Sequence, residues 1–222
     1  REQIIDLSEK ISSTYAKAYR FIGAAGFVQR DSCGALSASV NMQKLVKYVD
    51  RQCKKLLPQR GTKGSERRRF LTAITPSGYI GFLDLFSKKC KTLISVDDKM
   101  GLSNLLLSRL RDGAVCAGYS VISYYCPMSQ EGKLEHLYID ELGLGILSSD
   151  DFHHYEGDFT KRIYTTRFVD KEPAGSAKAR VRFNKKCERS LLSGAISSLE
   201  EAHDYHDKLE ALYVDTMDFE SV

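Results

Sequence analysis

Residues 91–125 contain the sequence pattern that most constrains the fold of this chain. The run 91–96 (KTLISV) has the β-branched and apolar composition of a buried strand, and the polar segment 97–101 follows it. From Ser103, apolar residues recur at helical spacing until about Gly118, before a second strand candidate, 119–125 (YSVISYY). A strand, a loop, a helix and a strand within about 35 residues form a βαβ unit. The pattern predicts an α/β fold with a mostly parallel sheet flanked by helices.

Further short elements are expected on both sides of this unit. Residues 70–74 have strand composition, and the segment 75–78 (TPSG) predicts a turn before a short helix over 79–86. Two more strands are expected at 134–139 and 142–147. An exposed loop rich in Asp and His (148–158) is expected after them.

Helical patterns flank the predicted sheet. Apolar residues form an approximate stripe over 3–31, and Asn41 is expected to cap a second helix that stops before Pro58. We expect these two helices to form a hairpin over 1–58 that ends a preceding repeat. Residues 59–69 (QRGTKGSERRR) are expected to be a basic linker, and residues 70–222 the main domain. A C-terminal helix from about Ala177 is expected to pack beside the hairpin.

Composition narrows the class of protein further. The 222 residues are 42% hydrophobic and 28% charged, and no run approaches the ~20 apolar residues that span a bilayer, so no membrane partner is expected. The chain has no initiator methionine and no signal peptide pattern, so we expect a piece of a longer chain. Its six cysteines form no CxxC pair, which favours a reducing, cytoplasmic location.

The net charge is +4, and basic residues cluster in the segments 60–69 and 178–189. Such runs can attract nucleic acid through counterion release. A solvated linker or helix face has the same composition, and this is the preferred interpretation.

The loop before Ser103 occupies the position of a phosphate-binding loop. Such a loop has the pattern GxxxxGK[ST] between a strand and a helix: backbone N–H groups surround the phosphates, and the lysine neutralises them. The window 96–103 (VDDKMGLS) retains Gly101 and Ser103, but Val96 replaces the first glycine and Leu102 replaces the lysine. The candidate nucleotide-binding residues are Lys99, Gly101, Ser103 and Asn104.

The replacements are unfavourable for a bound triphosphate. Losing a charged phosphate contact forfeits roughly 1.5 to 3 kcal/mol. Asp97 and Asp98 would each oppose a phosphate by about 4 kcal/mol at ~4 Å and an effective dielectric constant of ~20. The partial positive charge of the helix N-terminus would stabilise a bound phosphate by only about 0.3 to 1 kcal/mol. Weak or absent nucleotide binding is therefore predicted, the alternative being that Lys99 replaces the missing lysine.

Asp140 and Glu141 follow an apolar strand and are candidate carboxylates for Mg²⁺ or a water molecule, but a strand-end turn is the simpler and favoured interpretation. If the loop binds a nucleotide, the expected cofactors are ATP and Mg²⁺. No catalytic residue and no protein-bound metal site is assigned.

Three stretches of the chain resemble the second half of an uncharacterised bacterial family of tandem-repeat P-loop ATPases. They are 68–86 with its Ala-Ile-Thr-Pro-x-Gly segment, 118–147 with a Gly-Tyr strand leading to Cys-Pro, and 202–219 with a final His-Asp-x-Leu-Glu helix. The resemblance implies a P-loop NTPase-like domain, with a preceding ATPase repeat as its partner. This chain departs from the family pattern in the nucleotide loop itself, so the expected function is noncatalytic support or regulation of that repeat. Association of the chain with a second copy of itself stays open.

Other polar clusters have simpler explanations. The segment 203–207 (HDYHD) has a spacing that could ligate a metal, but a polar helix face is favoured. The histidines of 148–158 are expected to lie in an exposed loop rather than in an acid/base cluster. Cys126 is expected to be a buried structural thiol.

Overall fold

The computed structural model describes residues 1–129, 132–149 and 155–214, and within them six strands form one mixed sheet in the order β1-β5-β6-β7-β4-β8. β6 is antiparallel to both of its neighbours, whereas the other neighbouring pairs are parallel. The predicted α/β fold with a mostly parallel sheet flanked by helices is confirmed. The strands are β1 (Ser65–Arg69), β4 (Thr92–Asp97), β5 (Ser120–Tyr125), β6 (Leu134–Ile139), β7 (Leu144–Ser149) and β8 (Lys161–Tyr164).

The predicted strand, loop, helix and strand are all present as β4, α4 (Ser103–Cys116) and β5. The two strands are not neighbours, because β6 and β7 lie between them. β7 begins at Leu144, after a short 3-10 helix η1 (Asp140–Leu142) that takes the first residue expected for the strand. The edge strand β8 and the 3-10 helix η2 (Thr165–Phe168) were not predicted.

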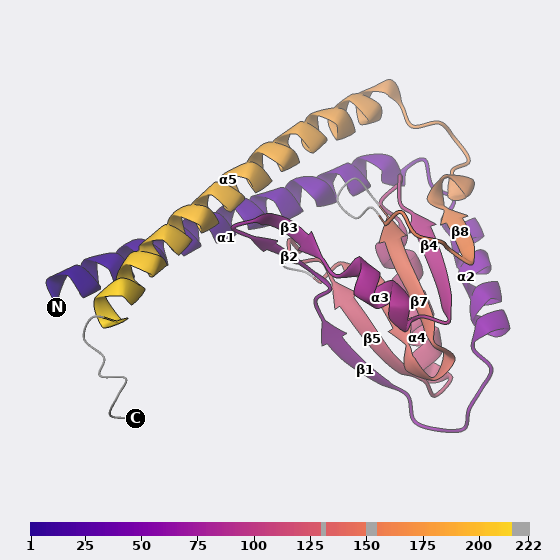
Figure 1. The fold of residues 1–222 in the computed structure, drawn as a ribbon. Helices are drawn as coiled ribbons and strands as arrows, with labels where there is room; N and C mark the ends of the chain where they lie inside the picture. The colour runs from indigo at the N-terminus through magenta and orange to yellow at the C-terminus, as the bar shows by residue number, and fades with distance from the viewer. Residues whose placement is uncertain (130–131, 150–154, 215–222) are drawn as a thin grey trace.

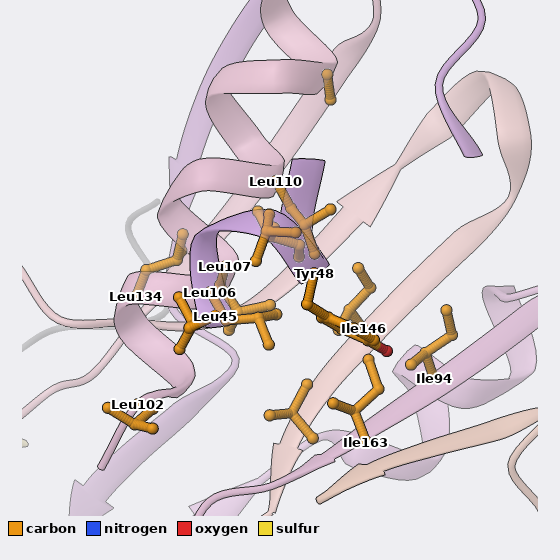
Figure 2. Packing of buried hydrophobic residues seen from close by; sticks show 14 of the residues in the cluster. Leu45, Tyr48, Ile94, Leu102, Leu106, Leu107, Leu110, Leu134, Ile146 and Ile163 are labelled. Atoms are coloured by element: carbon orange, nitrogen blue, oxygen red, sulfur yellow. The ribbon is translucent and has the colours of Figure 1, made fainter. Parts of the chain in front are cut away.

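The larger hydrophobic core lies on one face of the sheet, under α4 and α2 (Met42–Leu56). Figure 2 shows Leu45 and Tyr48 of α2 and Leu106, Leu107 and Leu110 of α4 meeting the strand residues. Successive residues of one strand alternate between the faces, so Ile94 joins this core while Leu93 faces the other side. The other face carries a smaller cluster around Phe86 of the short helix α3 (Leu83–Lys89).

Two long helices, α1 (Glu2–Ser37) and α5 (Gly175–Val214), lie side by side and extend beyond the sheet (Figure 1). Fully buried alanines on both helices, Ala18, Ala25, Ala195 and Ala202, allow their axes to approach closely. The predicted C-terminal helix and its packing beside the N-terminal helix are confirmed. The predicted hairpin of α1 with α2 is wrong, because α1 pairs with α5 while α2 packs on α4.

Local signals at the start of α2 were correct: the Lys44 amide donates to Asn41 Oδ1 at 2.8 Å, the expected helix cap. The boundaries between 59 and 86 need correction. The end of the expected linker is strand β1, which pairs with β5. The first half of the helix expected over 79–86 is strand β3 (Gly78–Gly81), because it pairs with β2 (Thr72–Thr75) across the predicted turn.

No helix in the described ranges combines the length and the apolar composition needed to cross a membrane. Residues 150–154 of the expected Asp- and His-rich loop lie outside the described residues, as do residues 215–219 of the final family-like stretch.

Candidate functional site

The loop between β4 and α4 lies at the carboxyl end of β4, as the phosphate-loop hypothesis requires. β4 ends at Asp97 and α4 begins at Ser103. Gly101 has a φ of +68°, a left-handed conformation that side-chain-bearing residues rarely adopt. The retained glycine is therefore explained by the turn into α4 alone, without a bound phosphate.

The carboxylate of Asp98 occupies the start of α4. Its Oδ1 accepts a hydrogen bond from the Leu102 amide at 2.6 Å, and the residue is 9% exposed. The unpaired N–H groups of a first helical turn carry partial positive charge and bind anions. The Asp98 side chain therefore occupies the position at the start of α4 where an anion could accept a hydrogen bond from the backbone.

The pKa of Asp98 reflects this buried position. Burial raises the pKa above its ordinary value, while hydrogen bonds with Ser103 and the positive charge of Lys133 act in the opposite direction. Since the raising effect is larger, the carboxyl group takes up a proton more readily in the folded chain than in the unfolded one.

The position of the motif lysine is apolar and buried. Leu102 is 8% exposed and belongs to the larger hydrophobic core. Lys99, the alternative cation, has a side chain that is 71% exposed, with Nζ 3.8 Å from Asp97 Oδ2. A pair this exposed contributes at most about 1 kcal/mol. Lys99 is thus a solvent-exposed cation at the rim of the loop.

Asn104, the fourth candidate, is used in the packing of α4. Its Oδ1 accepts from the amide of Leu134, the first residue of β6, at 2.9 Å. This bond ties the first turn of α4 to the sheet, so the side chain is not directed at a ligand above the loop. Ser103 is completely buried beside Asp98.

A cavity of about 540 Å³ lies over the loop, between the end of β4 and the helices α1 and α5. Its wall is highly charged, with Lys99, Lys133, Arg162 and Lys185 facing Asp97, Asp98 and Glu188. The volume is within the roughly 300 to 1,000 Å³ of small-molecule sites. The cavity is the candidate functional site because it lies where α/β folds place ligands, outside the carboxyl ends of parallel strands.

A hydrogen-bonded chain crosses this cavity. Lys133 Nζ donates to Gln29 Oε1 at 3.1 Å, and Gln29 Nε2 donates to Glu188 Oε1 at 3.1 Å. These three residues come from the segment before β6, from α1 and from α5. Cys33 of α1 lies so close to Gly101 that a Cβ there would overlap its sulfur. Helix α1 therefore packs directly against the loop at Gly101, beside the cavity.

Asp140 and Glu141 are not part of this site. The register pairs Ile139 with Leu144, and Leu144 with Thr92, so both acids lie where β4 begins. The loop lies at the other end of β4, about 20 Å away for a strand of six residues. They cannot hold Mg²⁺ for a nucleotide above Gly101. The antiparallel direction of β6, which the sequence did not reveal, is the reason.

Glu141 instead secures the sheet edge: Ser120 N donates to both of its oxygens, and its Oε1 lies 2.6 Å from a guanidinium nitrogen of Arg60. The pKa of Glu141 is lowered, because these hydrogen bonds outweigh the opposing effect of burial. A carboxylate held in this way belongs to the strand-end turn, the simpler interpretation of the sequence.

Of the remaining candidates, the polar residues near the end of α5 lie on an exposed helix face. His206, Asp207 and Glu210 bring ligand atoms within 4.8 Å of one another, but all three are exposed. His203 Nδ1 lies 3.2 Å from Asp207 Oδ1 on the same helix face. Cys126 is buried, as expected of a structural thiol, and burial raises its pKa well above the ordinary value. His153 and His154 lie outside the described residues.

Sequence reasoning missed the contributions of Gln29, Lys133, Arg162 and Glu188 to the cavity. No local signal marks them, because they come from four separate elements. The role of Asp98 had no such signal either, because Asp98 lies four residues before Leu102, the N-cap position of α4 at which an Asp commonly caps a helix. Comparisons of the chain with protein-family models, with curated proteins and with solved structures found no match.

Proposed function

We propose that this chain is a noncatalytic P-loop-type domain that supports or regulates an active ATPase repeat. The observation that carries the proposal is the Asp98 carboxylate, which accepts the Leu102 N–H at the start of α4. A strand, loop and helix in the position of a phosphate site, with an internal anion in place of the phosphate, fits a binding loop that has lost its ligand.

Three further features support this function. Leu102 places a buried apolar side chain where phosphoryl transfer needs a cation. Cys33 closes the approach to Gly101. The polar chain through Gln29 joins the sheet to both long helices, so the site is organised as a structural joint. These features leave the domain a packing and coupling role toward its ATPase partner.

Calorimetric titration with MgATP tests the proposal. We expect no binding tighter than about 100 μM, an affinity that corresponds to about 5.5 kcal/mol. Lys99→Ala should not change this result, and Lys54→Ala on the exposed side of α2 is the charge-matched control. Tighter binding that Lys99→Ala abolishes and Lys54→Ala leaves intact would establish the alternative, a nucleotide site in which Lys99 acts as the lysine.

A second measurement tests the internal anion directly. Asp98→Gly removes the carboxylate, so inorganic phosphate should raise the melting temperature of this variant more than that of the wild type. Sodium chloride at the same ionic strength is the control for screening. An equal effect of phosphate on both proteins would contradict the assignment of Asp98 as the occupant of the anion position.

A further inference from the structure

Strand β1 forms one edge of the six-stranded sheet and carries three consecutive arginines. It is hydrogen-bonded to β5 on one side, and within the described residues no strand pairs with its other side. The side chains of Arg67 and Arg68 are 56% and 71% exposed. The segment expected to be a flexible basic linker is therefore a fixed row of cations along a sheet edge.

The arginines of β1 lie next to tyrosines of β5 on both faces of this edge. On one face, the guanidinium carbon of Arg68 is 5.3 Å from the centre of the Tyr125 ring. On the other face, Arg69 is the register partner of Tyr124, whose electrostatic environment includes Arg67 and Arg69. Cationic and aromatic groups are thus interleaved along the edge.

Two exposed aromatic side chains continue this row beyond the end of β1. Phe70, next to Arg69, is 68% exposed, and Phe82 is 56% exposed. The Phe82 amide donates to the carbonyl oxygen of Leu71 at 3.1 Å, which holds the two segments together. Charged residues alone suffice to protect a sheet edge against aggregation. Two large exposed aromatic rings do not serve that purpose, and they place apolar surface directly beside the arginines.

Nearby acids do not cancel the positive charge of the edge. Glu66 points to the α4 side, where Tyr125 donates to it at 3.0 Å, and Arg111 and Arg68 lie 3.3 and 3.7 Å away. Asp140 is 3.8 Å from Arg67, and Asp84 is exposed in the first turn of α3. Lys89 lies over the Tyr138 ring on the same side of the sheet as α3. On the α3 side, Arg67, Arg69 and Lys89 therefore outnumber Asp84 and Asp140, while Arg68 lies on the α4 side with Glu66.

We propose that the edge formed by Arg67, Arg68, Arg69, Phe70 and Phe82 binds single-stranded nucleic acid. The guanidinium groups would contact successive phosphates, and the two phenylalanine rings would stack on unpaired bases. A duplex offers the same phosphates but keeps its bases stacked inside, so it cannot use the rings. The proposal does not depend on the state of the β4–α4 loop.

Fluorescence anisotropy with labelled oligothymidine and oligouridine of about 15 nucleotides tests this surface. We expect binding at about 50 mM salt that weakens as salt rises. Arg67→Ala/Arg69→Ala should reduce affinity at least tenfold and flatten the logarithmic salt dependence by about 1.4, or ~0.7 for each phosphate contact on a single strand. Lys54→Ala/Lys55→Ala on α2, which removes the same charge elsewhere, should leave both quantities unchanged.

The aromatic variants separate a nucleic-acid site from a general polyanion site. Phe70→Ala and Phe82→Ala should each weaken binding by roughly 5- to 150-fold, the cost of one lost base stack, with the salt dependence unchanged. Both rings are exposed, so the melting temperatures should stay close to the wild type. A preference for DNA or for RNA identifies the source of the strand, and either one supports the proposal.

Several outcomes would overturn the assignment. They are absence of binding at low salt, equal loss in the Lys54→Ala/Lys55→Ala control, tighter binding of duplex than of single strands, and affinity that does not respond to the phenylalanine variants. In the last case an acidic peptide should bind as well as the oligonucleotide, and the edge would be a site for acidic protein segments.

Discussion

The two faces of the sheet are covered very differently. One face lies under the 15-residue α2 and the 14-residue α4, and its core includes completely buried residues such as Leu45, Leu106 and Leu107. The other face is covered by the seven-residue α3, and Leu85 of this helix is 64% exposed. The first face supplies most of the hydrophobic stabilisation, since this scales with the apolar area removed from water.

This difference in coverage indicates which part of the sheet can carry exposed functional groups. In the β4–α4 loop, Asp98 and Asn104 are engaged in hydrogen bonds within the chain, with the amides of Leu102 and Leu134. The thinly covered face ends at the β1 edge, where cations and aromatic rings stay open to solvent. The difference in coverage between the two faces supports both proposals, and the experiments below test that difference.

The largest expected effect is on the densely covered face. Leu107→Ala should lower the free energy of unfolding by about 2 to 5 kcal/mol, because it leaves a cavity in a fully buried site. Leu85→Ala, the same substitution on α3, should change it by less than about 0.5 kcal/mol. Urea denaturation of both variants measures the difference. Similar losses at the two positions would mean that the faces are equally important for stability.

The next effect concerns α1, which covers the end of the sheet rather than either face. A Cβ on Gly26 would overlap the backbone carbonyl of Met128, whereas a Cβ on Gly34 of the same helix would meet nothing within 4 Å. Gly26→Ala should destabilise the protein by about 1 to 3 kcal/mol, and Gly34→Ala should stabilise it by up to about 1 kcal/mol. Thermal unfolding of the pair tests whether α1 is firmly docked. Stabilisation by both substitutions would contradict the contact with Met128.

A smaller effect is expected at Asp98 and depends on pH. The folded-state pKa is raised, so the contribution of this group to stability is fully present below its ordinary value of 3.8 and declines as pH rises through the folded-state value. The unfolding free energy of the wild type minus that of Asp98→Asn should therefore increase as pH falls from neutrality. We expect changes below about 2 kcal/mol, the upper range for a helix cap. Carboxylates common to both proteins, such as Glu66, cancel in the difference.

A difference between the two proteins that rises with pH would show that the folded state favours the charged form of Asp98. Its hydrogen bonds would then outweigh burial, and the order of the two effects given above would be reversed.

The smallest effect leaves stability unchanged and compares cysteines. Burial beside α3 raises the pKa of the Cys90 thiol to about 11. Because thiolate is the reactive form, Cys90 should react slowly with a thiol reagent at neutral pH, whereas the exposed Cys116 should react first. Mass spectrometry of partially labelled protein gives the order. Early labelling of Cys90 would show that the α3 face opens far more than the structure implies.

The sequence predicted the elements whose signals are local. Asn41 caps α2 through its own side chain, and the strand, loop and helix around Ser103 follow from composition and periodicity. The partner of α1 could not be predicted in this way, because a helical stripe shows that one face is buried but not what buries it. The strands β1 and β8 have arginine- and lysine-rich edge sequences, without the alternating apolar pattern of a half-buried strand.

The sequence predicted the position of the candidate site but not the residues that line it. Gly101 and Ser103 are where the loop hypothesis required them, yet the charge of Asp98 was weighed only against an external phosphate. Its hydrogen bond with Leu102 N, just before α4, became apparent only from the structure. Asp140 and Glu141 were misplaced, because the direction of β6 depends on pairing between distant segments.

Helix α1 is held close to the rest of the domain where Gly26 packs against Met128, and the long helical pair extends away from this point. Helix α1 continues from this contact toward Glu2 for about 36 Å at the usual rise per residue. A rotation of ~5° about the contact would displace the outer end by about 3 Å. The first and the last described turns of the pair lie together at that outer end (Figure 1). For a given change of angle at this contact, the displacement is therefore largest at the outer end of the pair.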